Sequence, residues 1–244
     1  TSADSVLQIA AHEEVIPLEQ LYEICRQARQ IMTGQHGVGR IIARPFIGEE
    51  GHFTRTANRR DFSLKPDRTL LNIMTEAGLY TCGIGKINDI FSGSGILESH
   101  PTHSNKEGIE AILQLMKADF NGLLFANLVD FDMLYGHRND IQGYADALEE
   151  FDASLKDIMA TLNENDLLII AGDHGCDPST PSTDHSREYI PILAYNKNLS
   201  PKNIGTRTTF ADIAATVAAF FKLPYDLAGV SFLTTEEIAN VQKG

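Results

Sequence analysis

The sequence predicts an α/β protein: a mostly parallel sheet flanked by helices, together with a smaller α+β domain. Two observations predict this fold. After Pro66, short apolar runs alternate with segments of helical periodicity, a pattern typical of strands joined by crossover helices. Before Pro66, the stretch 48–66 is irregular, polar and basic. We therefore expect a domain boundary near Pro66, which separates residues 1–66 from residues 67–244.

The smaller domain is expected to contain two strands and one helix. Residues 5–11 (SVLQIAA) and 39–46 (GRIIARPF) have the composition of strands. Pro17 is suited to open a helix between them. The apolar residues that follow recur with a period near 3.6, which indicates one buried helix face; they are Leu18, Leu21, Tyr22, Cys25, Ala28 and Met32.

The larger domain begins with a predicted helix over 68–77 and an extended segment over 79–87. A second helix is expected over 105–119. Residues 122–129 (GLLFANLV) then form an apolar run that is short enough for a buried strand.

The rest of the larger domain continues the alternation. Asp140 can cap a helix over 141–162, where the apolar residues show the clearest periodicity in the chain. Residues 167–171 (LLIIA) predict another buried strand, residues 190–195 a further strand, and residues 209–223 a helix rich in Ala and Phe.

The composition is that of a globular protein. Hydrophobic residues make up 43%, charged residues 22%, and the mean hydropathy is -0.15, which excludes disordered and fibrous chains. No apolar run approaches the roughly 20 residues of a membrane span, and residues 1–4 do not resemble a signal peptide. We expect a cytoplasmic protein without a membrane partner. Its three cysteines are widely separated, so we expect reduced thiols rather than disulfides or a thiolate zinc site.

The charge of the chain is strongly negative but unevenly distributed. A net charge of -13 argues against nucleic acid as a partner, because the phosphate backbone would be repelled. Between Val38 and Arg68, however, seven Lys and Arg residues stand against four acidic residues. This basic segment fits a local anion site; a solvated basic surface is the alternative.

Metal-ligating residues follow two of the predicted strands. In parallel sheets, ligands bind beyond the carboxyl ends of the strands, and oxygen and imidazole donors suit Zn or Mn. Any one of these residues could instead cap a helix or line a turn. Together, in two clusters that both follow buried strands, they indicate a metal site: Asp132, His137, Asp173, His174 and His185.

Several segments of the chain closely resemble the bacterial phosphopentomutase family, a member of the alkaline phosphatase superfamily. The stretches that fit DFDxxxGH and DHGxDPxxxxTDH are very specific in combination, whereas DHG alone would indicate only the superfamily. The resemblance extends to about Phe232 and is strongest in residues 1–14, 39–46, 53–66, 127–138 and 171–195.

This resemblance implies an alkaline-phosphatase-like core. Residues 67–244 would be the C-terminal part of the metal-binding core domain. Residues 1–66 would be the C-terminal part of a cap domain that binds substrate.

The family interconverts ribose 1-phosphate and ribose 5-phosphate, and their deoxy forms, through a phosphothreonine at a site with two Mn²⁺ ions. The resemblance implies that Asp132, His137 and His185 hold one ion and that Asp173 and His174 hold the second; other divalent metals could replace manganese. The nucleophilic Thr and a further Asp ligand belong to an N-terminal part of the family sequence that this chain lacks. No catalytic nucleophile is therefore expected in these 244 residues, and the chain alone is not expected to be an active mutase.

Substrate binding is expected to involve both domains. Arg40 and Arg55 are candidates for a phosphate clamp, because guanidinium pairs bidentately with phosphate oxygens. Asp4 could accept hydrogen bonds from ribose hydroxyls. For Ser2 and Ile42, a packing role explains the residue nearly as well. The resemblance implies the following substrate-binding residues: Ser2, Asp4, Arg40, Ile42, Arg55 and Lys86.

Two alternatives remain open on the sequence. The first is another metal-dependent phosphomutase or phosphomonoesterase of the same superfamily, such as a phosphoglycerate mutase, which should lack this cap. The second is a catalytically inert fragment that binds metal or sugar phosphate. Loss of ribose-phosphate turnover in Arg40→Ala would favour the phosphopentomutase interpretation over the first alternative.

Overall fold

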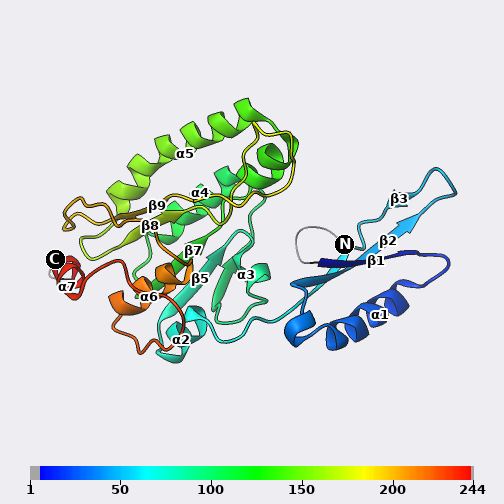
Figure 1. The fold of residues 1–244 in the computed structure, drawn as a ribbon, viewed down its shortest axis with the longest axis horizontal. Coiled ribbons are helices and arrows are strands. Elements are labelled where there is room, and N and C mark those ends of the chain that lie inside the picture. The colour runs from blue at the N-terminus through cyan, green and yellow to red at the C-terminus, as the bar shows by residue number, and fades with distance from the viewer. Residues whose placement is uncertain (1–5, 243–244) are drawn as a thin grey trace. The chain divides into compact units, whose positions relative to one another are not determined.

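The computed structural model describes residues 6–242. The chain forms two compact units (Figure 1), unit 1 from Thr1 to Pro66 and unit 2 from Asp67 to Gly244. None of the helices in the described part of the chain combines the length and the apolar content that a membrane crossing requires.

Unit 1 is built on a four-stranded mixed sheet. Strand β1 (Val6–His12) pairs in parallel with β2 (Arg40–Ile47). On the other side of β2, the short strands β3 (Thr54–Arg55) and β4 (Arg60–Ser63) both pair antiparallel to it. The sequence had predicted β1 and β2 but no strand within 48–66. Strands this short carry little hydrophobic periodicity of their own and depend on pairing with β2.

Helix α1 (Leu18–Ile31) covers one face of this sheet (Figure 1). It begins after Pro17, and its periodic apolar side chains face the strands. Leu21 and Cys25 are buried against Ile41 and other residues of β1 and β2. A short 3₁₀ turn at 34–36 follows the helix. The core of unit 1 therefore lies between α1 and the sheet.

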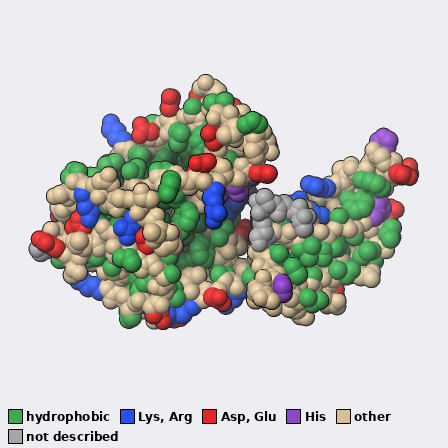
Figure 2. Space-filling view, in the orientation of Figure 1, with side chains coloured by type: hydrophobic (Ala, Val, Ile, Leu, Met, Phe, Trp, Pro, Cys, Tyr) green, Lys and Arg blue, Asp and Glu red, His purple; other side chains and the backbone are tan. Residues whose placement is uncertain are grey.

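The opposite face of the sheet, called here the open face, carries polar side chains. Because side chains alternate along a strand, burial of Ile41 and Ala43 against α1 directs Arg40 and Arg44 to the open face. The pairing of β2 with β4 places Asp61 beside Ile42 on this face. Figure 2 shows basic side chains gathered on unit 1 near β3.

Unit 2 contains a three-stranded parallel sheet with β5 (Tyr80–Ile84) at its centre. Strands β6 (Glu98–His100) and β7 (Gly122–Ala126) pair with it on either side. Four of the five residues of β5 are buried, and α2 (Leu70–Glu76) packs next to this strand. Because all three strands run in parallel, their carboxyl ends meet at one edge, where the sequence predicted a site.

A second, two-stranded sheet consists of β8 (Leu168–Ala171) and β9 (Ile192–Tyr195). These strands are antiparallel, unlike the three strands of the other sheet in unit 2. No helix connects them, so the chain returns through a long loop and enters β9 from the opposite direction. Leu193 is 62% exposed on β9, and Phe125 is 38% exposed on β7.

The other helices of unit 2 pack around these strands (Figure 1). Two of them bury side chains against the sheets: α6 contributes Val217 and Ala218, and α7 contributes Ile238. The sequence predicted α6 but neither α3 nor α7, and it expected an extended segment to reach Ile87, where α3 begins. The helices are α3 (Ile87–Ile90), α4 (Asn105–Leu115), α5 (Ile141–Thr161), α6 (Ala211–Phe220) and α7 (Thr235–Val241).

The three cysteines are free, as their spacing predicted. Cys25 and Cys82 are buried in the two units, and burial raises the pKa of both thiols. Cys176 is partly buried in the loop after β8.

Candidate metal centre and open face

The first metal-ligand loop follows β7. Its chain forms a π-helical turn, η2 (Phe131–Tyr135), and then a 3₁₀ turn, η3 (Gly136–Arg138). These two turns carry Asp132 and His137. Gly136 is needed between them, because a Cβ atom there would lie 2.3 Å from Cys176 Sγ, closer than van der Waals contact allows.

The same loop is anchored to α4 by two buried residues. The Asn105 backbone N–H donates to Asp130 Oδ2 at 2.7 Å, and the Asp130 backbone N–H donates to Asn105 Oδ1 at 2.9 Å. Asn105 is 3% exposed and Asp130 is 9% exposed. This reciprocal pair, called here the Asn105–Asp130 clamp, fixes the loop two residues before Asp132.

The second metal-ligand loop connects β8 to β9. An isolated antiparallel bridge joins Gly175 to Ser186, whose N–H donates to the Gly175 carbonyl at 2.9 Å. A Cβ atom on Gly175 would lie 2.7 Å from the Ser186 carbonyl oxygen, so glycine permits this close approach. The bridge folds the loop back on itself and stacks the imidazole rings of His174 and His185, with centroids 3.6 Å apart.

The donor atoms of the two loops converge. His185 Nε2 lies 2.9 Å from Asp132 Oδ1, and His137 Nε2 lies 3.2 Å from the same oxygen. Donors that bind one divalent ion at about 2.1 Å are themselves roughly 3–3.4 Å apart. The spacing of these three donors therefore fits a shared ion.

The remaining two predicted ligands extend this cluster. A ligand atom of His174 lies within 4.8 Å of those of Asp132 and His185. The side chain of Asp173 is 70% exposed, and its Oδ1 is 3.6 Å from His174 Nε2. The structure thus gathers all five predicted ligands on two loops of unit 2, with His174 beside the Asp132 and His185 donors.

Two carbonyl groups orient the imidazole rings. His137 Nδ1 donates to the Thr183 carbonyl at 2.6 Å, and His174 Nδ1 donates to the Gly175 carbonyl at 3.2 Å. Because a carbonyl can only accept, Nδ1 carries the proton in both bonds. Nε2 of each ring is then the nitrogen that can bind a metal, the arrangement found for most metal-bound histidines.

The pKa values of Cys176 and Tyr144, which lie next to the cluster, reflect its negative charge. Burial raises the pKa of the Cys176 thiol, and the neighbouring Asp132 and Asp173 raise it further. Burial also raises the pKa of Tyr144, with added contributions from Cys176 and Asp173. Carboxylate oxygens and imidazole nitrogens are the donors that Mn²⁺ and Zn²⁺ accept. The residues present therefore fit a divalent cation.

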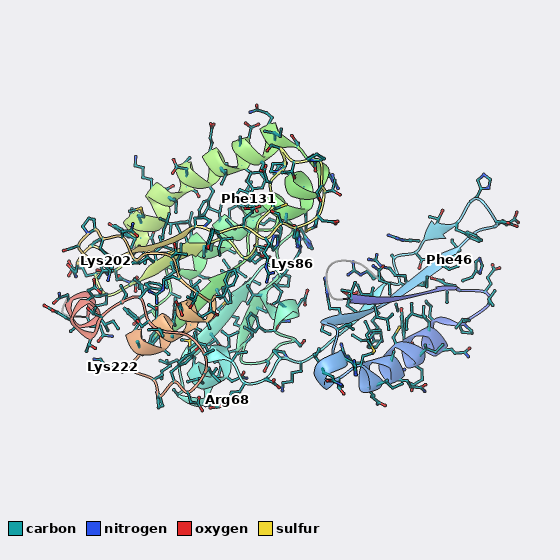
Figure 3. All side chains as sticks on the ribbon, viewed as in Figure 1. Phe46, Arg68, Lys86, Phe131, Lys202 and Lys222 are labelled. Carbon is teal, nitrogen blue, oxygen red and sulfur yellow. The ribbon has the colours of Figure 1, made fainter. Side chains whose placement is uncertain are left out.

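The predicted substrate residues are divided between the two units. Lys86 stands at the start of α3, directly after β5, on the same side of unit 2 as Phe131 of η2 (Figure 3). In unit 1, Arg40 and Ile42 lie on β2 and Arg55 on β3, all toward the open face. The two remaining predicted residues, Ser2 and Asp4, lie outside the described residues.

The open face also contains residues that the sequence did not single out. Asp61 Oδ2 is 2.6 Å from Arg59 and 3.8 Å from Arg40. Gln8 Oε1 accepts a hydrogen bond from Arg44 Nε at 3.0 Å. Gln8 and Arg44 are 36 positions apart in the chain, and no pattern in the sequence could pair them.

Comparison with known proteins decides the family. A family model that describes the Metalloenzyme superfamily matches residues 46–225, well over half of the chain. The chain belongs to this superfamily. Membership agrees with the donor cluster, because both metal-ligand loops lie within the matched residues.

Within the Metalloenzyme superfamily, the chain is similar to curated phosphopentomutases. The one from Acetivibrio thermocellus is 60% identical over 235 residues, which is 96% of this chain and 61% of that protein. Those from Caldanaerobacter subterraneus and Dictyoglomus thermophilum are 58% and 54% identical over similar shares. The chain therefore spans about 60% of the length of the curated relatives that it matches.

The solved phosphoglycerate mutase of Leishmania mexicana is similar in fold. It superposes with a TM-score of 0.52 at 17% sequence identity, over 66% of this chain and 38% of that chain. Together with the family match, this likeness confirms the predicted α/β fold of the alkaline phosphatase type.

Proposed function

We propose that the protein containing this chain is a phosphopentomutase, which interconverts ribose 1-phosphate and ribose 5-phosphate and their deoxy forms. The observation that carries the proposal is identity of 53–60% to curated phosphopentomutases over 96% of the chain. The donor cluster on the two loops supports it, since such a reaction needs groups that stabilise phosphoryl oxygens.

The proposed metal site holds two Mn²⁺ ions. Asp132, His137 and His185 would hold one, and Asp173 and His174 would contribute to the other. When bound, such ions neutralise phosphoryl oxygens and favour an ionised nucleophile. The carbonyl of Thr183 holds His137 with Nε2 toward the donors, and the Gly175 carbonyl does the same for His174.

The two units would have different roles. Unit 2 would be the C-terminal part of a metal-binding core domain, and unit 1 the C-terminal part of a substrate-binding cap domain. Arg40, Arg55 and Ile42 of unit 1 and Lys86 of unit 2 would contact the sugar phosphate, as would Ser2 and Asp4. The nucleophilic Thr would come from the part of the protein that the relatives contain and this chain does not. We expect a cytoplasmic enzyme, and no turnover by the 244-residue chain alone.

The test is an assay of the full natural protein that contains this chain. Conversion of ribose 1-phosphate to ribose 5-phosphate is followed by ³¹P NMR with Mn²⁺ present. Asp132→Asn should abolish turnover, whereas Asp152→Asn, which removes an exposed carboxylate from α5, should leave it unchanged. Full activity of Asp132→Asn would refute the proposed metal site.

The same preparation separates the alternative superfamily activities. Phosphoglycerate mutase and phosphomonoesterase assays run in parallel should show little or no turnover. Arg40→Ala should reduce ribose-phosphate turnover, because it removes a guanidinium from the proposed substrate face. Efficient turnover of phosphoglycerate, with none of ribose phosphates, would overturn the assignment.

A further inference from the structure

The second metal-ligand loop carries three of the five predicted ligands, yet little of it is buried. Within residues 172–191, all of which the structure describes, the chain forms no helix or strand apart from the bridge between Gly175 and Ser186. Every residue from 179 to 185 is exposed. Burial of apolar surface, the main favourable contribution to folding, therefore adds little to this stretch, and polar contacts must hold His185 in place.

The first metal-ligand loop, by contrast, is joined directly to a long helix. Asn139 follows η3 in the left-handed conformation, with a φ of 53°, and its N–H donates to the Gly136 carbonyl at 3.2 Å. Asparagine is one of the few residues besides glycine that adopt this conformation. The next residue, Asp140, caps the 21-residue helix α5. Asn139 therefore lies at an ordered junction between the turn that carries His137 and α5.

The side chain of Asn139 connects this junction to the second metal-ligand loop. Its Nδ2 donates to the Thr180 carbonyl at 2.6 Å, across 41 positions in the chain. Because a carbonyl can only accept, the amide must face Thr180 with its nitrogen. Figure 1 shows the second loop, drawn in yellow, passing the start of α5, where this hydrogen bond forms.

The Thr180 carbonyl belongs to a compact turn. The N–H and the hydroxyl of Thr180 both donate to the Asp177 carbonyl, at 3.2 and 2.9 Å. The N–H and the hydroxyl of Ser179 both donate to Asp177 Oδ1, at 2.8 and 2.6 Å. Since these bonds make residues 177–180 one ordered unit, a single hydrogen bond from Asn139 can position the whole turn. The turn lies in the chain between the two histidine ligands of the second loop.

Two other contacts between the loops involve predicted ligands. His137 Nδ1 donates to the Thr183 carbonyl at 2.6 Å, and His185 Nε2 lies 2.9 Å from Asp132 Oδ1. Replacing either histidine would remove a metal donor together with the contact. Asn139 is not a predicted ligand, so replacing it tests the contact between the loops by itself.

We propose that Asn139 is a positioning residue for the metal site: its hydrogen bond to the Thr180 carbonyl holds the second loop against η3, so that His185 lies beside Asp132 before a metal binds. The inference rests on the proposed function, and it adds to that metal site a residue that binds no ion. A loop that is already ordered in the metal-free protein does not lose conformational freedom on binding, and such preorganisation raises affinity.

The experiment compares two variants of the full natural protein that contains this chain. Asn139→Asp keeps the size of the side chain and its tolerance of the left-handed conformation, but it replaces the donor by an oxygen that repels the Thr180 carbonyl. Asn139→Gly keeps the backbone conformation and removes the side chain. Each variant should lower the ratio of closed to open second loop about tenfold, the effect expected for one hydrogen bond.

Two measurements report this ratio. Amide hydrogen exchange of residues 175–188, read by mass spectrometry in the EDTA-treated protein, follows the open fraction of the loop. Mn²⁺ affinity, measured by calorimetry, follows the closed fraction, because only that fraction presents the complete donor set. For such an exposed loop, both should change about twofold or more. The factor by which exchange accelerates, multiplied by the factor by which affinity falls, should be about ten.

Two other asparagines of unit 2 are the controls. Asn203→Asp adds the same charge at an exposed position, where Oδ1 accepts from the Gly205 N–H, and it should change neither quantity. Asn196→Ala removes a buried amide that donates to the carbonyls of Glu164 and Asp166, at 2.7 and 2.8 Å. It should lower Tm without changing Mn²⁺ affinity or exchange in the second loop, as expected of an asparagine with a purely structural role. Thermal unfolding checks that every variant is folded.

Wild-type exchange or wild-type Mn²⁺ affinity in both Asn139 variants would overturn the positioning role, and so would an equal loss of affinity in Asn203→Asp or Asn196→Ala. A wild type that binds no Mn²⁺ would instead refute the metal site of the proposed function. The exchange measurement needs neither metal nor turnover, so it supports or overturns the role of Asn139 in ordering the loop in that case too. Failure of this inference can thus be distinguished from failure of the proposed function.

Discussion

The Asn105–Asp130 clamp should determine both the stability of unit 2 and the position of its first metal-ligand loop. Asn105→Ala removes the acceptor of the buried Asp130 N–H. An unsatisfied buried N–H costs about 1–3 kcal/mol. The substitution also removes Asn105 Nδ2, a buried donor without a hydrogen-bond partner, which offsets part of this cost. We expect a net loss of about 1–2 kcal/mol in the free energy of unfolding.

The assay is differential scanning calorimetry of the EDTA-treated protein. For a domain of this size, each kcal/mol lowers Tm by about 2–4 °C. Asn165→Ala, which truncates an exposed asparagine in the turn before β8, should change Tm by less than about 1 °C, because exposed substitutions away from special contacts have small effects. Mn²⁺ affinity should fall in Asn105→Ala as well, since the clamp lies two residues from Asp132. An Asn105→Ala protein with wild-type Tm and wild-type affinity would refute the reasoning.

Two further predictions concern single contacts in unit 2. Gly136→Ala should lower the free energy of unfolding of unit 2 by about 1–3 kcal/mol, because the added methyl group overpacks against Cys176. Adding Cys176→Ala should restore most of that loss. If chemical denaturation shows that the two substitutions have purely additive effects, the contact between Gly136 and Cys176 is contradicted. The second concerns Asp212, whose pKa is lowered mainly by the hydrogen bond from the Val230 N–H and also by Arg207. A lowered pKa in the folded state stabilises the fold above the ordinary value of 3.8, and this contribution disappears as the pH falls through the lowered value. Asp212→Asn should therefore lower the free energy of unfolding by about 2 kcal/mol at pH 7, and the gap in stability between wild type and variant should become smaller below pH 3.8. A stability gap that does not change with pH in thermal unfolding would contradict this prediction.

Much of the fold could be predicted because long helices and buried strands show hydrophobic patterns in the sequence itself. Helix α5 spans 21 residues with a clear apolar period, and Asp140 caps it by accepting from the Gly143 N–H, as predicted. Strands β5 and β7 were predicted from apolar runs. The short strands β3, β4 and β6 were missed because they depend on their partners. Helix α7 was missed although Thr234 and Glu237 form a capping box, a signal that can be read from sequence.

The direction of a strand is a different limitation. An apolar run predicts a buried strand but not which way it runs, and β9 proved antiparallel to β8. Direction depends on how the connecting loop returns, and that depends on contacts such as the bridge between Gly175 and Ser186.

The candidate site shows the same contrast. The predicted ligand residues follow β7 and β8, so the apolar runs before them were enough to place both loops next to strand ends. That these residues bind a metal stays a prediction. The groups that orient these ligands are distant in sequence: Thr183 accepts from His137, and Asn105 anchors Asp130. Such partners are determined by tertiary structure and leave no pattern along the chain.

The most direct test of the metal centre is calorimetric titration of Mn²⁺ into the 244-residue chain and two variants. His185→Ala removes a donor that lies 2.9 Å from Asp132 Oδ1, and His100→Ala removes a histidine on β6 that pairs with Glu98 instead. The account predicts saturable binding by the wild type and by His100→Ala, and a loss of about 100-fold or more in His185→Ala, or roughly 2.7 kcal/mol. Equal affinity in all three proteins, or no binding by the wild type, would contradict it.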